Sequence, residues 1–165
     1  MQQVIVSNVT LSTAMIIAFC DDVEISRSTG FLWSHGDQDF LITNWHCITG
    51  VNPFSGKSLS KTGARPNRLT MALPTTQFGV KFALDLPLYD AEGWALWNVH
   101  PTAGEQVDII AFPIREEFRS TQDAQRSLAK PFNEFESMRH QAFVGDELMV
   151  VGFPRNLHMH GLPLF

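Results

Sequence analysis

The 165-residue chain has little of several residue types, and each shortage excludes a class of protein. Its two cysteines, Cys20 and Cys47, are too few for a disulfide framework and form no paired-thiol motif. Two reduced, buried thiols in a cytoplasmic protein are therefore expected. The longest apolar stretch, residues 14–20, is far shorter than the roughly twenty residues of a membrane-spanning helix. No Lys or Arg precedes that stretch, which argues against a signal peptide.

Positive charge is also scarce. Twelve Lys and Arg residues stand against 17 Asp and Glu residues, which gives a net charge of −5. Because no segment gathers the basic residues into a patch, neither nucleic acid nor a membrane surface is an expected partner. By contrast, 13 Phe and four Trp residues supply the bulky apolar side chains of a folded core. The composition predicts one globular domain or a tight pair of small ones.

Apolar residues alternate with polar ones along most of the first 115 residues. The alternation in residues 69–73 and 80–86 is typical of half-buried antiparallel strands. Turn residues separate the strand candidates, and Trp94 and Trp97 are expected to fill the interior between them. About seven short strands of this kind predict a β-sandwich or a β-barrel. The remaining strand candidates are the short apolar runs at residues 13–20, 30–33, 40–43, 94–99 and 109–114.

The composition divides the chain into three parts. Residues 1–115 contain most of the strand candidates and are expected to form a β-barrel. Residues 115–136 include nine charged residues among twenty-two, which predicts a solvated connector at about 116–137. The remaining residues, 138–165, include a predicted strand at 148–151 but are too few to build a core of their own. Either this tail packs on the first unit, or it belongs to an unfinished second one. An unfinished second barrel would leave Leu148, Val150 and Phe153 exposed unless something covers them, which favours self-association.

The most informative segment is Thr43-Asn44-Trp45-His46, at the end of the predicted strand 40–43. Gly30, in the preceding strand, permits a close backbone approach, and the end of a strand is a rigid mount for a functional side chain. A carboxylate, Asp108, stands sixty-two residues after His46, at the start of the apolar run 109–114. Two alternatives stay open: a single histidine is commonly structural, and Asp108 could cap a turn. Asp85 and Asp90 are weaker candidates because neither precedes a continuous apolar strand.

This segment resembles the trypsin-like serine peptidases of the chymotrypsin fold, in particular bacterial members whose strand ending Thr-x-x-His carries the general base. Asp108, in Val107-Asp108-Ile109-Ile110-Ala111, is similar to the family's Asp-Ile/Val-Ala position, which orients the histidine. The resemblance implies an all-β, chymotrypsin-like fold with its first antiparallel barrel complete and its second only begun, residues 145–154 resembling an early part of that second barrel. It further implies a serine-type endopeptidase acting on peptides or proteins, with His46 and Asp108 as catalytic residues. Asn44-Trp45 replaces the more familiar pair of alanines, so the packing behind His46 must differ.

The expected chemistry explains these residue types. A hydroxyl is a poor nucleophile near neutral pH, so an imidazole must take its proton while a carboxylate holds the other ring nitrogen. The family's nucleophile lies in a Gly-x-Ser-Gly loop after the aspartate, but Ser120, Ser127 and Ser137 lack glycine neighbours. The printed chain therefore resembles an N-terminal portion that ends before the catalytic serine, and is expected to be inactive. The alternative function is a non-catalytic β-barrel that binds a peptide or a partner protein.

Other motifs are weaker. Gly56-Lys57-Ser58 precedes Asp108 and is followed by Leu59, so it does not fit a nucleophile loop. Adjacent side chains at a strand end point to opposite faces, so the Cys47 thiol is expected to diverge from His46 and to act as a small buried hydrophobe. His158 and His160 lack a third ligand for a metal ion. No metal and no cofactor is expected.

Overall fold

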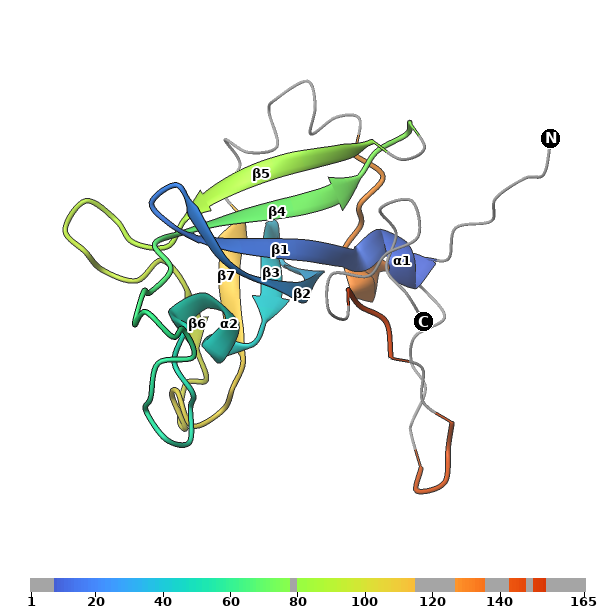
Figure 1. The fold of residues 1–165 in the computed structure, drawn as a ribbon. Helices are drawn as coiled ribbons and strands as arrows, with labels where there is room; N and C mark the ends of the chain where they lie inside the picture. Colours follow the sequence, from blue (N-terminus) through green and yellow to red (C-terminus); the bar gives the residue numbers. More distant parts are fainter. Residues whose placement is uncertain (1–7, 78–79, 115–126, 136–142, 148–149, 154–165) are drawn as a thin grey trace.

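The computed structural model describes residues 8–77, 80–114, 127–135, 143–147 and 150–153. This part of the chain is mostly β and forms one antiparallel sheet of seven strands, so the predicted all-β class is confirmed (Figure 1). Three single turns of helix accompany the sheet: α1 (Asn8–Ser12), α2 (Trp45–Thr49) and the 3-10 turn η3 (Phe132–Glu134). The strands are β1 (Thr13–Cys20), β2 (Val23–His35), β3 (Gln38–Thr43), β4 (Arg68–Pro74), β5 (Lys81–Pro87), β6 (Asn98–Val99) and β7 (Ile110–Ile114).

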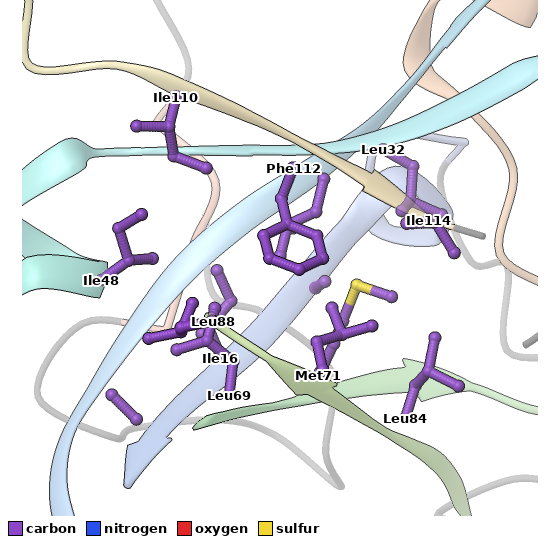
Figure 2. Packing of buried hydrophobic residues seen from close by; sticks show 14 of the residues in the cluster. Ile16, Leu32, Ile48, Leu69, Met71, Leu84, Leu88, Ile110, Phe112 and Ile114 are labelled. Carbon is purple, nitrogen blue, oxygen red and sulfur yellow. The ribbon is translucent and has the colours of Figure 1, made fainter. Parts of the chain in front are cut away.

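The order of strands across the sheet is β5-β4-β1-β2-β3-β7-β6, and each neighbouring pair is antiparallel. The sheet curls, because strands far apart in this order contribute to the same core. Buried side chains from β7 at one end and from β4 and β5 at the other belong to one cluster, and they point toward one another in Figure 2. On β7 every second residue is buried, namely Ile110, Phe112 and Ile114. Each such side chain contributes about 1.5–3 kcal/mol by leaving water.

The expectation of a complete barrel is not met, because among the described residues no ladder joins β5 to β6. After β5 the chain makes a tight turn at Asp90–Gly93 and returns through an isolated bridge between Tyr89 and Ala95. The N–H of Leu96 also donates to the carbonyl of Leu88 at 3.0 Å. Only two residues then pair with β7 as β6, so the sheet is curled but open.

Most predicted strands lie where the alternation placed them. The runs at 13–20, 69–73, 80–86 and 109–114 fall on β1, β4, β5 and β7. The run at 94–99 was expected to be one strand, but only Asn98–Val99 pair as β6. The prediction for Trp94 is wrong, since its side chain is 73% exposed on the turn after β5. Trp97 is partly buried against the core and packs edge-on against Tyr89, with ring centroids 5.4 Å apart.

The last described residues of the tail, 152–153, pack on the outer face of the sheet. Of the two alternatives for this tail, Phe153 follows the one in which it packs on the first unit: it is 5% exposed and packs with Met15 of β1 and Ala72 of β4. The Lys81 ammonium lies 4.7 Å from the Phe153 ring centre, and burial of that ammonium, together with the charge of Arg27, lowers its pKa. The backbone N–H of Phe153 donates to the Thr29 hydroxyl at 2.9 Å. Phe153 is buried because this outer face of the sheet is itself apolar.

The structure tests only some of the other expectations for the second half of the chain, because several of the residues concerned are not described. Val150 is 83% exposed, as expected, but neither described residue of the predicted strand 148–151 is in a strand. Much of the predicted connector, residues 116–126 and 136–137, lies outside the described residues, as do Leu148, His158 and His160. Self-association through this tail stays a prediction. In the described ranges, no helix has both the length and the apolar character needed to cross a bilayer.

Gly30 of β2 has no room for a side chain, and its replacement by alanine is expected to destabilise the fold. A Cβ atom there would lie 2.7 Å from Ile16 Cδ1, 2.7 Å from Leu41 Cδ1 and 2.8 Å from the Ile42 carbonyl oxygen. Because that oxygen belongs to the backbone of the adjacent strand, the clash cannot be relieved by side chains alone. We expect Gly30→Ala to lower the free energy of unfolding by about 3 kcal/mol, measured by urea denaturation.

Two variants separate overpacking from the general effect of losing a glycine. Gly36, in the β2–β3 turn, has φ 58° and no atom within 4 Å of a built Cβ, so Gly36→Ala should cost only about 1 kcal/mol of left-handed strain. Adding Ile16→Val to Gly30→Ala removes one clashing methyl group, so the double variant should lose less stability than the sum of the two singles. Equal losses at Gly30 and Gly36 would contradict the overpacking.

Candidate active site

His46 stands on a single helical turn that follows β3, not on the end of the strand as expected. Asn44 keeps an extended conformation (φ −75°, ψ 142°), and α2 then ends at Gly50, whose φ of 67° is left-handed. The N–H of Gly50 donates to the His46 carbonyl at 3.0 Å. Trp45 and Ile48 anchor the turn in the core, where Trp45 is 7% exposed. The bulky Trp45 next to His46 is thus the core anchor of the histidine's turn.

The two residues singled out in the sequence lie in direct contact. His46 Nδ1 is 2.5 Å from Asp108 Oδ2, and the backbone N–H of His46 donates to Asp108 Oδ1 at 2.9 Å. The register of β3 and β7 pairs Thr43 with Ile110, which brings the residues just beyond those ends together. The predicted proximity of His46 and Asp108 is therefore confirmed, and the carboxylate holds both the ring and the backbone of the histidine.

A third residue, Asn44, fixes the aspartate in turn. Its side-chain amide donates to the Asp108 carbonyl oxygen at 2.9 Å and lies 3.3 Å from Oδ2. The sequence singled out Asn44 only as a departure from the family pattern, and nothing in one sequence indicates that its amide reaches across to β7. Because Asn44 holds the backbone of Asp108 as well as its carboxylate, the orientation of the His46 ring is set by two consecutive contacts.

This arrangement determines which ring nitrogen is available for chemistry. An ionised carboxylate only accepts hydrogen bonds, so the proton shared with Asp108 belongs on Nδ1 and leaves a lone pair on Nε2. The side chains are partly open to solvent, at 37% for His46 and 26% for Asp108. A neutral imidazole held in this way is equipped to accept a proton at Nε2.

The atom in contact with Nε2 is the thiol sulfur of Cys47. Cys47 Sγ lies 3.4 Å from His46 Nε2, so the expectation that the two side chains diverge is wrong. Successive side chains on a strand point to opposite faces, whereas on a helix they differ by only about 100° around the axis. The short α2 therefore brings together side chains that a strand would have separated.

The Cys47 thiol is half-buried between α2 and β2. Burial raises the pKa of the Cys47 thiol above its usual value, and the negative charge of Asp108 raises it further. Hydrogen bonding with the side chains of Ser28 and Thr43 acts in the opposite direction. The Thr43 hydroxyl also donates to the Thr29 carbonyl at 2.9 Å, which leaves Ser28 as the more available donor. The thiol therefore rests in its protonated form at neutral pH.

A pocket of about 380 Å³ lies beside this cluster. Asn44 and Ile109, which flank the pair in sequence, form part of its lining. Its wall is mostly apolar and comes from α1, from the outer face of β2 and β3, and from the chain near η3. Phe31 and Phe132 meet there edge-on, with ring centroids 6.0 Å apart. The pocket reaches the neighbours of the pair, Asn44 and Ile109, but His46 and Asp108 themselves are not among its lining residues.

The competing candidates are engaged elsewhere. Asp85 accepts hydrogen bonds from Arg68 and Thr70 on β4, and Asp90 accepts the N–H groups of its own turn. Ser58 donates to the Ser60 carbonyl within an exposed loop, and Ser127 lies against Pro74 at the end of β4. Ser120 and Ser137 lie outside the described residues. None of the four described side chains has a contact with His46.

Within the described ranges, no three His, Cys, Asp or Glu side chains converge as a metal site would require. Comparisons of the chain with protein-family models, with curated proteins and with solved structures found no match. The function of the cluster must therefore be inferred from its own geometry.

Proposed function

We propose that the chain carries the general-base half of a serine-type endopeptidase of the chymotrypsin fold. The observation that carries the proposal is the double hold of Asp108 on His46, at ring Nδ1 and at the backbone N–H, which in the neutral imidazole places the ring proton on Nδ1 and the lone pair on Nε2. The curled antiparallel sheet with both residues just beyond the ends of paired strands supports it. The proposal keeps the cytoplasmic location and the peptide or protein substrate expected from the sequence.

In this mechanism His46 is the base and Asp108 positions it. As a serine oxygen attacks the peptide carbonyl carbon, its proton passes to His46 Nε2, and Asp108 stabilises the imidazolium that forms. The same proton then passes to the nitrogen of the leaving amine as the peptide bond breaks. The serine and the N–H groups that stabilise the oxyanion are not among the printed residues in the family's Gly-x-Ser-Gly form. Hydrolysis by this mechanism needs both groups in addition to His46 and Asp108.

The direct test is to sequence past the codon for Phe165, express the longer form and assay it. We expect a Gly-x-Ser-Gly loop, hydrolysis of a fluorogenic peptide, and one equivalent of phosphorylation by a serine-directed organophosphate. The 165-residue chain, as the matched control, should show neither hydrolysis nor phosphorylation. A longer form without that loop, or without hydrolysis, would contradict the peptidase proposal.

The pocket supports a second candidate function, namely a non-catalytic domain that binds peptides. Its apolar wall beside Asn44 and Ile109 fits an apolar peptide side chain. This function requires that the 165-residue chain alone binds peptides, as measured by calorimetric titration, with affinity that Phe132→Ala lowers. Binding without any phosphorylation of the longer form would favour the second candidate over the first.

A further inference from the structure

We propose that Cys47, His46 and Asp108 form a thiol–imidazole–carboxylate relay, and that Cys47 is a site for covalent modification by low-molecular-weight disulfides. The proposal goes beyond the peptidase function and does not depend on it. It rests on the 3.4 Å contact between Cys47 Sγ and the nitrogen of His46 that faces away from Asp108. A nucleophile within reach of a base that is itself oriented by a third group is the general arrangement of an activated nucleophile.

The relay would provide the proton acceptor that the Cys47 thiol needs in order to react. A half-buried thiol next to a carboxylate ionises reluctantly, and only the thiolate attacks a disulfide. His46 removes the obstacle because it can take the Sγ proton and so generate the attacking thiolate within the pair. The thiolate formed in this way is strongly nucleophilic, because the nucleophilicity of a thiolate rises with its basicity.

The chemical step is thiol–disulfide exchange. The Sγ–H proton passes to His46 Nε2 while Sγ attacks one sulfur of the small disulfide. A new Sγ–S bond forms and the original S–S bond breaks. The departing sulfur takes the proton from the imidazolium and leaves as a free thiol. Cys47 is oxidised to a mixed disulfide, and the small disulfide, which is the oxidant, is reduced.

The modification would have a consequence for the site. The new group would be attached 3.4 Å from Nε2, on the side from which any substrate or nucleophile must approach that nitrogen. A mixed disulfide at Cys47 therefore blocks the base reversibly, and reduction restores it. Cys20 is the last residue of β1 and pairs with Val23 of β2. Among the described residues, no histidine is recorded in contact with the Cys20 thiol.

The test uses the 165-residue chain with Cys20→Ser, which leaves Cys47 as its one thiol. The probe is 4,4′-dithiodipyridine, an uncharged disulfide whose released thione is followed by its absorbance. We expect one equivalent to react at pH 7, and about a hundredfold slower reaction after His46→Gln. Over the pH range in which His46 is neutral and Cys47 is protonated, the rate in the Cys20→Ser chain should depend weakly on pH, whereas the His46→Gln variant should speed up steeply as pH rises.

The matched control is the reverse pair, Cys47→Ser with and without His46→Gln, in which Cys20 is the reacting thiol. Its rate should be the same in both variants, which would show that His46→Gln has not loosened the fold. Three results would overturn the proposal: equal rates and pH profiles with and without His46, a Cys47 that reacts only after unfolding in urea, or a Cys20 that responds equally to His46→Gln. Because the readout is thione release, such a failure leaves the peptidase proposal untouched, and a longer form without hydrolysis leaves this one untouched.

Discussion

Under the peptidase proposal, replacement of His46 by alanine in a serine-bearing longer form is expected to lower the turnover of peptide hydrolysis by about a millionfold. The change removes the acceptor for the hydroxyl proton, and no other base within the described residues contacts that position except the weakly basic Cys47 sulfur. His46 is partly exposed and Trp45 and Ile48 anchor its helical turn, so the fold should survive. The measurement is steady-state hydrolysis of a fluorogenic peptide, together with a urea melt.

The matched control for His46→Ala is His35→Ala. His35 lies exposed at the end of β2, where its backbone pairs with Gln38, so its loss removes an imidazole without touching the site. We expect His35→Ala to keep full turnover. Turnover in His46→Ala within about tenfold of the parent, with the fold intact, would show that the imidazole is not the base.

The elements that could be predicted from the sequence are those whose pattern is local. The buried residues Leu69, Met71 and Leu73 alternate along β4 because one face of this strand meets the core, and the alternation is visible in the letters alone. The pairing of Asp108 with His46 comes from the resemblance of their two segments to the trypsin-like peptidases, and both residues stand at the boundary of an apolar run. When two such strands pair, their boundary residues meet, and the register of β3 with β7 does this.

Two kinds of feature could not be predicted from the sequence. One is a contact between residues far apart in the chain, and the other is an element too short to show a repeating pattern of apolar residues. The five residues of α2 span little more than one turn, so no 3.6-residue pattern marks them, and His46 and Cys47 were assigned strand geometry. The burial of Phe153 depends on the apolar outer face formed by Met15 and Ala72. These residues are far from Phe153 in the sequence, so no local pattern around Phe153 predicts the contact. The same holds for the open edge between β5 and β6, where the chain turns outward at Asp90.

The assignment of His46 as the base depends on Asp108 accepting a hydrogen bond at each of its carboxylate oxygens, and Asp108→Asn removes one of these acceptors. In Asp108→Asn the remaining oxygen can still accept the His46 backbone N–H, but the amide nitrogen would face the ring and donate to Nδ1. The ring proton is then driven onto Nε2, which can no longer accept a proton from the nucleophile. We expect peptide hydrolysis by the longer form to fall about ten-thousandfold, as the corresponding change does in serine peptidases, with little change in KM.

The matched control for Asp108→Asn is Asp85→Asn on β5. Asp85 is another strand carboxylate bound by side chains, Arg68 and Thr70, and its own side chain is 65% exposed away from His46. The same change from carboxylate to amide there should leave hydrolysis unaltered, because only its charge and those two contacts are lost. A variant at Asp108 that retains more than about a tenth of the activity would mean that the carboxylate merely caps the turn before β7. In that case His46 would be a structural histidine, held for the packing of α2 against the sheet and not for proton transfer.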